Sequence, residues 1–288
     1  MLRHIKLSHL LVLAAIVTIA LATGGAWQFS EDIEALARAL APAWIGIALV
    51  YWVLWRQITP ATPDTPNGLP PRPLTTDFAP LKLDMRYADI ASLPLNRLEI
   101  VVVDTETTGL NTRKDSLIQV GAVRIVDGEL IKGDSFERLA NPGRPIPANT
   151  QRFHGITDEM VAHAPADGEI LQEFLDYAGN AVLVGYNIAF DLAFMNRIGE
   201  IRNPTLDTML LSVGAFPSRQ DHSLEALADH FNEEIHSRHT ALGDADATAR
   251  IFLHLIPELD RAGARTFGDA QDLCAHSADR IRSLGPCG

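Results

Sequence analysis

The chain has 288 residues, 47% of them hydrophobic, and a formal net charge of −12. That acidic balance argues against a protein that coats long nucleic acid by neutralising its phosphates. Its two cysteines, Cys274 and Cys287, both lie near the C-terminus without ligand spacing, so neither a disulfide scaffold nor a thiolate metal site is indicated.

Residues 1–59 hold all four tryptophans and two uncharged apolar runs, at about 7–27 and 39–55. At about 1.5 Å per residue, a helix over the first run reaches about 31 Å, the thickness of a bilayer core. Basic residues flank the pair of runs and acidic residues lie between them, so the positive-inside rule places both ends in the cytoplasm. We therefore expect an anchor of two transmembrane helices in the cell (inner) membrane, with the rest of the chain cytoplasmic.

Two alternatives remain for this segment. Arg3 and Lys6 could form the basic region of a cleaved signal peptide, with Ala20-Leu21-Ala22 as its cleavage site. Residues 39–55 would then remain as a stop-transfer helix, and the chain after this helix would still be cytoplasmic. Two buried core helices are the less favoured alternative, because no amphipathic helix nearby could cover them.

The remaining chain is predicted to contain a linker, one globular domain and a tail. Seven prolines between Pro60 and Pro80 disfavour helix and central strand, so residues 60–97 are expected to be an extended linker and lead-in. The globular domain is placed at 98–260 and a C-terminal helical tail at 261–288.

The domain begins with a continuous β-branched run, Leu98–Asp104, which is typical of a central strand buried on both faces. Asp104 and Glu106 are two positions apart, so their side chains share a face if the extended conformation continues. Paired carboxylates repel unless a cation lies between them, and Mg²⁺ and Mn²⁺ prefer oxygen ligands. Taken alone, the same pattern also fits a solvated turn.

Three further segments extend this prediction. Residues 117–126 and 129–139 are strand-like and meet at Asp127-Gly128, a strong hairpin signal, so a mixed sheet is expected. Residues 181–186 predict another buried strand, which leads into a helix over 188–198 with Asp191 in its first turn. A third acid is therefore expected at the carboxyl end of a strand.

Towards the C-terminus, His239 lies on a predicted loop, and Asp244 opens a predicted helix that runs through Leu255. His222, His230 and His236 lack an acid at the same spacing and are predicted to be surface or helix residues. Asp207 is interpreted as a helix cap and Asp246 as a solvated first-turn residue.

Three of these stretches together resemble the motifs of the DEDDh exonucleases, most closely the epsilon-subunit-like branch of bacterial DNA polymerase III. They are Asp104-Thr-Glu106-Thr-Thr-Gly-Leu, Asn187-Ile-Ala-Phe190-Asp191 and His239-Thr-Ala-Leu-Gly-Asp244-Ala. Residues 153–158 are similar to a further family stretch that lines the nucleotide site. Tyr186 departs from the pattern, because many members have His there, but this removes no metal ligand. The resemblance covers about residues 104–255 and implies an α/β, RNase H-like fold: a mixed five-stranded sheet flanked by helices.

The resemblance also implies a catalytic site. It assigns two divalent metal ions, Mg²⁺ or Mn²⁺, to Asp104, Glu106, Asp191 and Asp244, and the role of general base to His239. The residues that would contact the substrate end are Thr107, Gly109, Leu110, His154, Asn187 and Phe190.

The function expected from this resemblance is a metal-dependent 3′-5′ exonuclease that releases nucleoside 5′-monophosphates from single-stranded ends, with DNA favoured. A DNA polymerase subunit and the lipid bilayer are expected partners. The alternatives are an exonuclease for RNA or short oligonucleotides, and a non-catalytic nucleic-acid-binding module at the membrane.

Overall fold

The computed structural model describes residues 75, 77–83 and 87–283. The two predicted transmembrane runs, at about 7–27 and 39–55, lie outside the described residues, as does most of the proline-rich segment. Within the described part of the chain, no helix combines the length and the apolar character that a membrane crossing requires.

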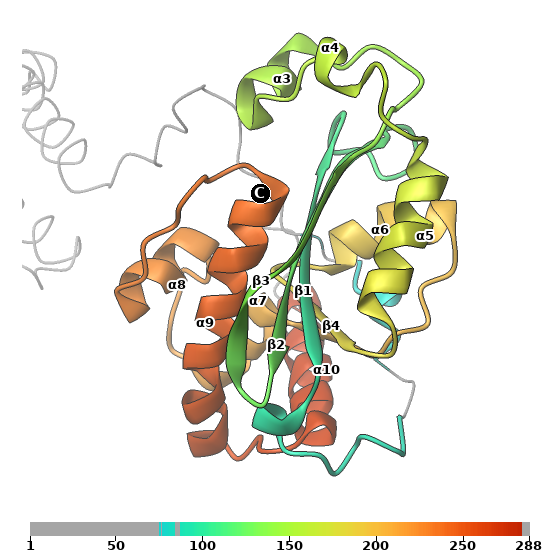
Figure 1. Cartoon of the computed structure of the whole chain (residues 1–288). Coiled ribbons are helices and arrows are strands. Elements are labelled where there is room, and N and C mark those ends of the chain that lie inside the picture. The colour runs from blue at the N-terminus through green and yellow to red at the C-terminus, as the bar shows by residue number, and fades with distance from the viewer. Residues whose placement is uncertain (1–74, 76, 84–86, 284–288) are drawn as a thin grey trace, which may run out of the picture. The chain divides into compact units, whose positions relative to one another are not determined.

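A five-stranded mixed sheet forms the centre of the fold, in the order β3-β2-β1-β4-β5 (Figure 1). β1 pairs antiparallel with β2 and parallel with β4; β2 and β3 are antiparallel, and β4 and β5 are parallel. The prediction of a mixed five-stranded sheet is therefore confirmed. The strands are β1 (Ile100–Thr107), β2 (Leu117–Val126), β3 (Glu129–Leu139), β4 (Val182–Gly185) and β5 (Thr205–Asp207).

Local sequence explains the two longest strands. β2 and β3 have the predicted bounds, and the residues between them, Asp127 and Gly128, adopt φ values of 50° and 75°. Positive φ at both central positions is the geometry of a tight hairpin turn whose twist matches that of the strands.

β1 is buried along its whole length and continues three residues beyond the predicted end, so that Asp104 and Glu106 both lie on the strand.

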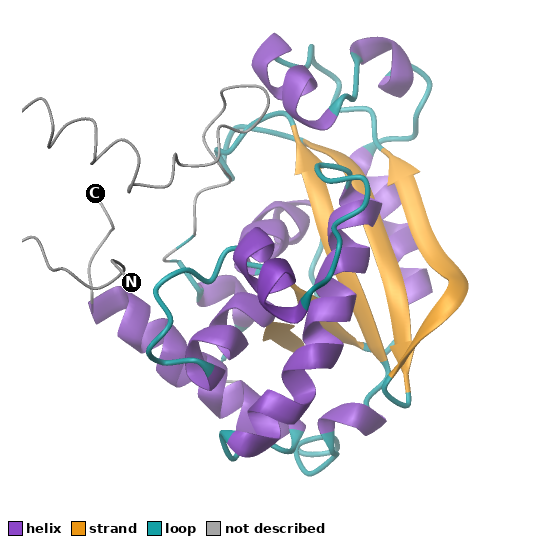
Figure 2. Cartoon of the chain, turned by 90° about the vertical axis from the view of Figure 1, so that its left-hand side faces the viewer, coloured by secondary structure: helices purple, strands orange, loops and turns teal. Residues whose placement is uncertain are grey.

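Helices cover both faces of this sheet. α9 packs against β1 and β2 on one face, and α5 packs against β2 and β3 on the other (Figure 2). The helices are α3 (Ala148–His154), α4 (Asp158–Val161), α5 (Asp167–Ala178), α6 (Ala189–Ile198), α7 (Thr208–Ala215), α8 (Leu224–Phe231), α9 (Ala241–Arg261) and α10 (Phe267–Ser283), with short 3₁₀ turns at Ala79–Leu81 and Leu95–Arg97.

The main hydrophobic core includes residues on both sides of the range 98–260. Phe78 and Leu81 from the lead-in, and Phe267 and Cys274 from α10, are almost completely buried in the same cluster as the strands. α10 packs against α7 and β5. Residues before and after the predicted domain range therefore contribute to its stability through buried apolar area.

α3 and α4 lie beyond the end of the long strands, near the end of β1 (Figure 1). Their segment packs around a separate small cluster of Ile118, Ile146, Ile156 and Val161. This arrangement places α3 beside the polar end of β1, where the carboxylates lie.

Candidate active site

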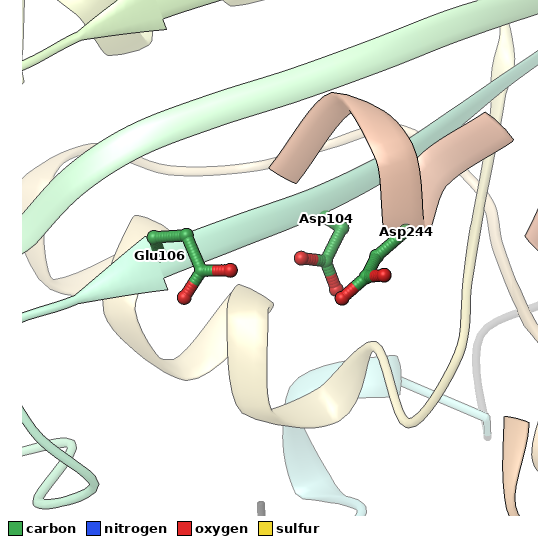
Figure 3. A group of neighbouring side chains, drawn as sticks. All are labelled: Asp104, Glu106 and Asp244. Atoms are coloured by element: carbon green, nitrogen blue, oxygen red, sulfur yellow. The ribbon is translucent and has the colours of Figure 1, made fainter. Parts of the chain in front are cut away.

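Three carboxylates converge at the end of β1. Asp104 and Glu106 leave the strand on the side from which Asp244 approaches in the first turn of α9 (Figure 3). One oxygen of each side chain lies within 4.8 Å of the others, and the residues are only 7%, 9% and 5% exposed. Residues 140 positions apart in the sequence are thus brought together by the packing of α9 on the sheet.

The first turn of α9 is held against β2 by two features. The Gln119 side-chain oxygen accepts a hydrogen bond from the Ala241 amide at 3.2 Å, and this amide has no partner within its own helix. Gly121 faces the backbone of Ala241 and Leu242 so closely that a Cβ at this position would collide with it. The close approach brings Asp244 to Asp104.

The chemistry of the cluster fits divalent metal ions. Burying three like charges together is costly unless cations compensate them, and carboxylate oxygens are the ligands that Mg²⁺ and Mn²⁺ prefer. Asp104, Glu106 and Asp244 provide such a donor set.

Asp191 is not part of this group of three carboxylates. It is completely buried in the first turn of α6, and its Oδ1 accepts a 2.5 Å hydrogen bond from the Thr105 hydroxyl. Thr105 lies between the two acids of β1, so strand alternation directs its side chain to the opposite face. The structure therefore brings three of the four predicted ligands together and connects the fourth to β1 through Thr105.

His239 lies on the loop before α9, as predicted, with a φ of 67°. Its ring contacts the ring of Phe153 from α3, with 4.0 Å between the ring centroids. Burial, together with the neighbouring positive charge of Arg238, lowers the pKa of His239 to about 4. The imidazole is therefore neutral at pH 7 and able to accept a proton.

A pocket of about 670 Å³ opens over the carboxylates. Asp104, Glu106, Asp244 and His239 line it, and so do five of the six residues predicted to contact the substrate end: Thr107, Gly109, Leu110, His154 and Phe190. The sixth, Asn187, is not among the lining residues. It is 1% exposed, with a φ of 54°, and its backbone N–H donates to Oδ1 of Asp207.

His154 lines this pocket with its ring in one defined tautomer. Its Nδ1 accepts from the Ile156 amide at 3.0 Å, and burial lowers the pKa of the imidazole to about 4. The ring is therefore neutral with its proton on Nε2, and Nε2 makes no hydrogen bond to the described part of the chain.

The pocket has a second wall that the sequence did not indicate. Residues 220–225 and Arg238 line it, together with Tyr186. The Tyr186 hydroxyl donates to the His222 carbonyl at 2.9 Å. Tyr186, the residue that departs from the pattern of the second motif, therefore contacts this wall. His222, predicted to be a surface or helix residue, is half-buried on the loop before α8 and lines the pocket.

Four further residues were predicted to lie outside the active site. His230 lies on α8 and His236 is exposed, as predicted. Asp207 caps α7, with its Oδ1 accepting from the Met209 and Leu210 amides. Asp246 is half-buried and pairs with Arg250 rather than being solvated.

The exonuclease family model (RNase_T) matches residues 101–252, more than half of the chain. The chain is 49% identical over 187 residues to a DNA polymerase III subunit epsilon-like protein of Rhodobacter capsulatus, covering 62% of this chain and 27% of that protein. It is 35% identical over 170 residues to DNA polymerase III PolC-type of Bacillus subtilis, covering 57% of this chain and 12% of that protein. The matched region is thus a minor part of each relative.

Two solved structures share the fold. The zinc-bound complex of E. coli ExoI with ssDNA superposes with a TM-score of 0.51 at 16% identity, covering 58% of this chain and 42% of that one. Cell-death related nuclease 4 (CRN-4) superposes with a TM-score of 0.50 at 15% identity, covering 56% of this chain and 64% of that one. The chain therefore belongs to the exonuclease family (RNase_T), whose model matches residues 101–252.

Proposed function

We propose that the chain hydrolyses phosphodiester bonds at single-stranded 3′ ends, preferably of DNA, and releases nucleoside 5′-monophosphates. The observation that carries this proposal is the buried group of Asp104, Glu106 and Asp244 in one pocket with the neutral His239. When bound there, divalent ions activate water and stabilise charge on the phosphate and the leaving oxygen.

Each side chain has a role that is consistent with its position. Asp104, Glu106 and Asp244 would hold the ions, with Asp191 supporting them through Thr105. His239 would take the proton of the attacking water, for which a neutral imidazole is required. This division leaves the rest of the pocket to bind and orient the substrate end.

The pocket provides apolar and donor groups for one terminal nucleotide. Leu110 is 46% exposed at its edge, and the rings of Phe153 and Phe190 line it, so a base could pack against them. The Nε2–H of His154 would donate to an oxygen of the same nucleotide. Recognition of a single unpaired nucleotide supports a single-stranded end.

The charge of the pocket also favours short single-stranded ends over duplex. Among the described residues that line it are six acids and one permanently charged base, Arg238. Duplex binding relies on many basic contacts to phosphates, which this lining does not offer. The preference for DNA rests on the relatives, which are named as DNA polymerase III proteins.

Matched 5′-labelled DNA and RNA oligonucleotides test the substrate proposal. We expect single-residue shortening from the 3′ end, faster on DNA, in the presence of Mg²⁺ or Mn²⁺ and complete inhibition by EDTA. Asp104→Ala protein purified in parallel controls for contaminating nucleases. Faster RNA digestion would overturn the DNA preference, internal cleavage would overturn the exonuclease mode, and metal-independent cleavage would overturn the mechanism.

We also propose that residues 7–27 and 39–55 anchor the enzyme in the cell (inner) membrane with its active site in the cytoplasm. The support is the length of the apolar runs and the charges around them. The full chain should stay in the membrane pellet after carbonate extraction, and a reporter active only in the cytoplasm should work when fused after Gly288. Release by carbonate would contradict anchoring, and an inactive reporter on a stable fusion would contradict the orientation.

A DNA polymerase subunit is the proposed protein partner, on the strength of the names of the relatives. Affinity purification of the full chain from its own cells should enrich a polymerase subunit over an unrelated membrane protein of similar abundance. Absence of that enrichment after crosslinking would contradict the partnership without affecting the nuclease assignment.

A further inference from the structure

Arg238 joins the acidic cluster to the second wall of the pocket. Its Nη1 forms an ion pair with Oδ2 of Asp244, while its Nε and Nη2 donate to Oε1 of Glu225 at 2.9 and 2.7 Å. Glu225 lies in the first turn of α8. One guanidinium is therefore shared between a carboxylate of the metal-binding group and a carboxylate outside it.

The arginine occupies an unusual electrostatic position. It is the single permanently charged base among the described residues that line the pocket, where it faces Asp244, Glu225 and Asp104 and lies beside His239. Its side chain is 31% exposed, so its charge is only partly screened by water. The protein thus supplies one counter-charge of its own to a cluster that also fits divalent ions.

We propose that Arg238 is a positioning residue that competes with a divalent ion for the carboxylate of Asp244, and that Glu225 sets the strength of this competition. An oxygen that accepts from a guanidinium has less negative charge to offer a metal. Glu225 binds the other side of the same guanidinium and so weakens its hold on Asp244. This inference rests on the metal-dependent function proposed above.

The proposal predicts effects of opposite sign for two residues that are not metal ligands. Arg238→Gln removes the competing charge, so metal affinity should rise. Glu225→Gln leaves Arg238 with Asp244 as its principal acidic partner, so metal affinity should fall. Because Glu225 is proposed to act through Arg238, its substitution should have little effect once Arg238 is already Gln.

The experiment is a Mn²⁺ titration of the full chain in mild detergent, with free Mn²⁺ followed by electron paramagnetic resonance and no nucleic acid present. We expect Arg238→Gln to lower the apparent dissociation constant about three- to tenfold, and Glu225→Gln to raise it by a similar factor, the size of one partly screened charge interaction. The double variant should match Arg238→Gln. Arg250→Gln, which removes the same charge from α9 outside the pocket, should leave the constant within about twofold.

Three results would overturn the proposal. Weaker Mn²⁺ binding by folded Arg238→Gln protein would mean that Arg238 holds Asp244 ready for the metal. An equal shift in Arg250→Gln would show a general effect of net charge. An undiminished Glu225→Gln effect in the double variant would show that Glu225 attracts the metal directly. Because no substrate is present, these results are independent of whether the enzyme prefers DNA.

Discussion

Thr105 on β1 and Asp191 on α6 are joined by a 2.5 Å hydrogen bond in which the threonine hydroxyl donates to the carboxylate. Both residues are buried, at 3% and 0% exposure. Thr105 is flanked by Asp104 and Glu106, so this bond connects the second motif to the strand that carries the first. The orientation of Asp191 and that of β1 are therefore coupled.

Thr105→Val should test this coupling, because valine keeps the shape and removes the donor. A hydrogen bond to a charged group contributes about 1.5–3 kcal/mol, so we expect a loss of stability of that order and a rate at least about tenfold lower. Thr205→Val is the matched control: it removes another buried threonine hydroxyl, bonded to the Leu81 carbonyl at 3.0 Å, on the edge strand β5, which β4 separates from β1. Urea unfolding and steady-state rates measure both effects. Equal rate losses in Thr105→Val and Thr205→Val would mean that general destabilisation of the fold lowers the rate, and would contradict a specific role of the Thr105–Asp191 bond.

Asp104→Ala and Asp244→Ala should each abolish turnover, because each removes an oxygen donor from a group whose members lie within 4.8 Å. Asp246→Ala is the control two residues along α9. Asp246 pairs with Arg250 and is not among the residues that line the pocket, so its loss should leave the rate nearly unchanged. Turnover with Mg²⁺ and thermal unfolding of each variant provide the measurement. An inactive Asp246→Ala beside an active Asp244→Ala would contradict the assignment of the third motif.

His239→Ala should fold and bind Mn²⁺ but lose about 10²–10⁴ in rate, the usual contribution of a general base. Burial and Arg238 lower the pKa of His239 to about 4, so the imidazole is uncharged around pH 7. The loss of rate in His239→Ala should therefore be seen at that pH. The residual rate should rise with pH as hydroxide replaces the missing base. A pH–rate profile of the two proteins measures this. Full activity of His239→Ala at neutral pH, with Asp104→Ala inactive, would remove the base assignment and leave the metal ligands in place.

Asp207→Asn should change how stability depends on pH. Burial raises the pKa of Asp207 to about 7, although backbone N–H groups that donate to it act in the opposite direction. The folded state therefore binds the proton more tightly than the unfolded state, and its stability relative to Asp207→Asn should fall as pH rises from about 4 through about 7. Urea unfolding across this range measures the difference in the free energy of unfolding.

Asp269→Asn supplies the control of opposite sign. The Thr266 and Arg265 amides donate to Asp269 and lower its pKa, so the stability it contributes is present above its ordinary pKa and is lost as pH falls through the lowered value. A difference between Asp207→Asn and the unsubstituted chain that stays constant from about pH 4 to 7 would contradict the proton uptake proposed for Asp207.

Several features of the fold could be predicted because their causes are local. The β2–β3 hairpin has the predicted bounds, since two strand-like runs flank Asp127-Gly128, which adopts the turn. The pairing of Asp104 with Glu106 is a consequence of the two-residue period of a strand. Asp207 was correctly interpreted as a cap, because the capping hydrogen bonds involve residues two and three positions away.

By itself, the sequence determined the central strands, the type of chemistry and the acids of the first motif, because those depend on neighbours a few residues apart. Only the tertiary structure decided that Asp244 would join them while Asp191 bonds to Thr105. It also decided that Arg238 would lie between two acids. These contacts depend on how closely α9, α6 and α8 approach the sheet, which is set by packing at positions such as Gly121 rather than by periodicity along the chain.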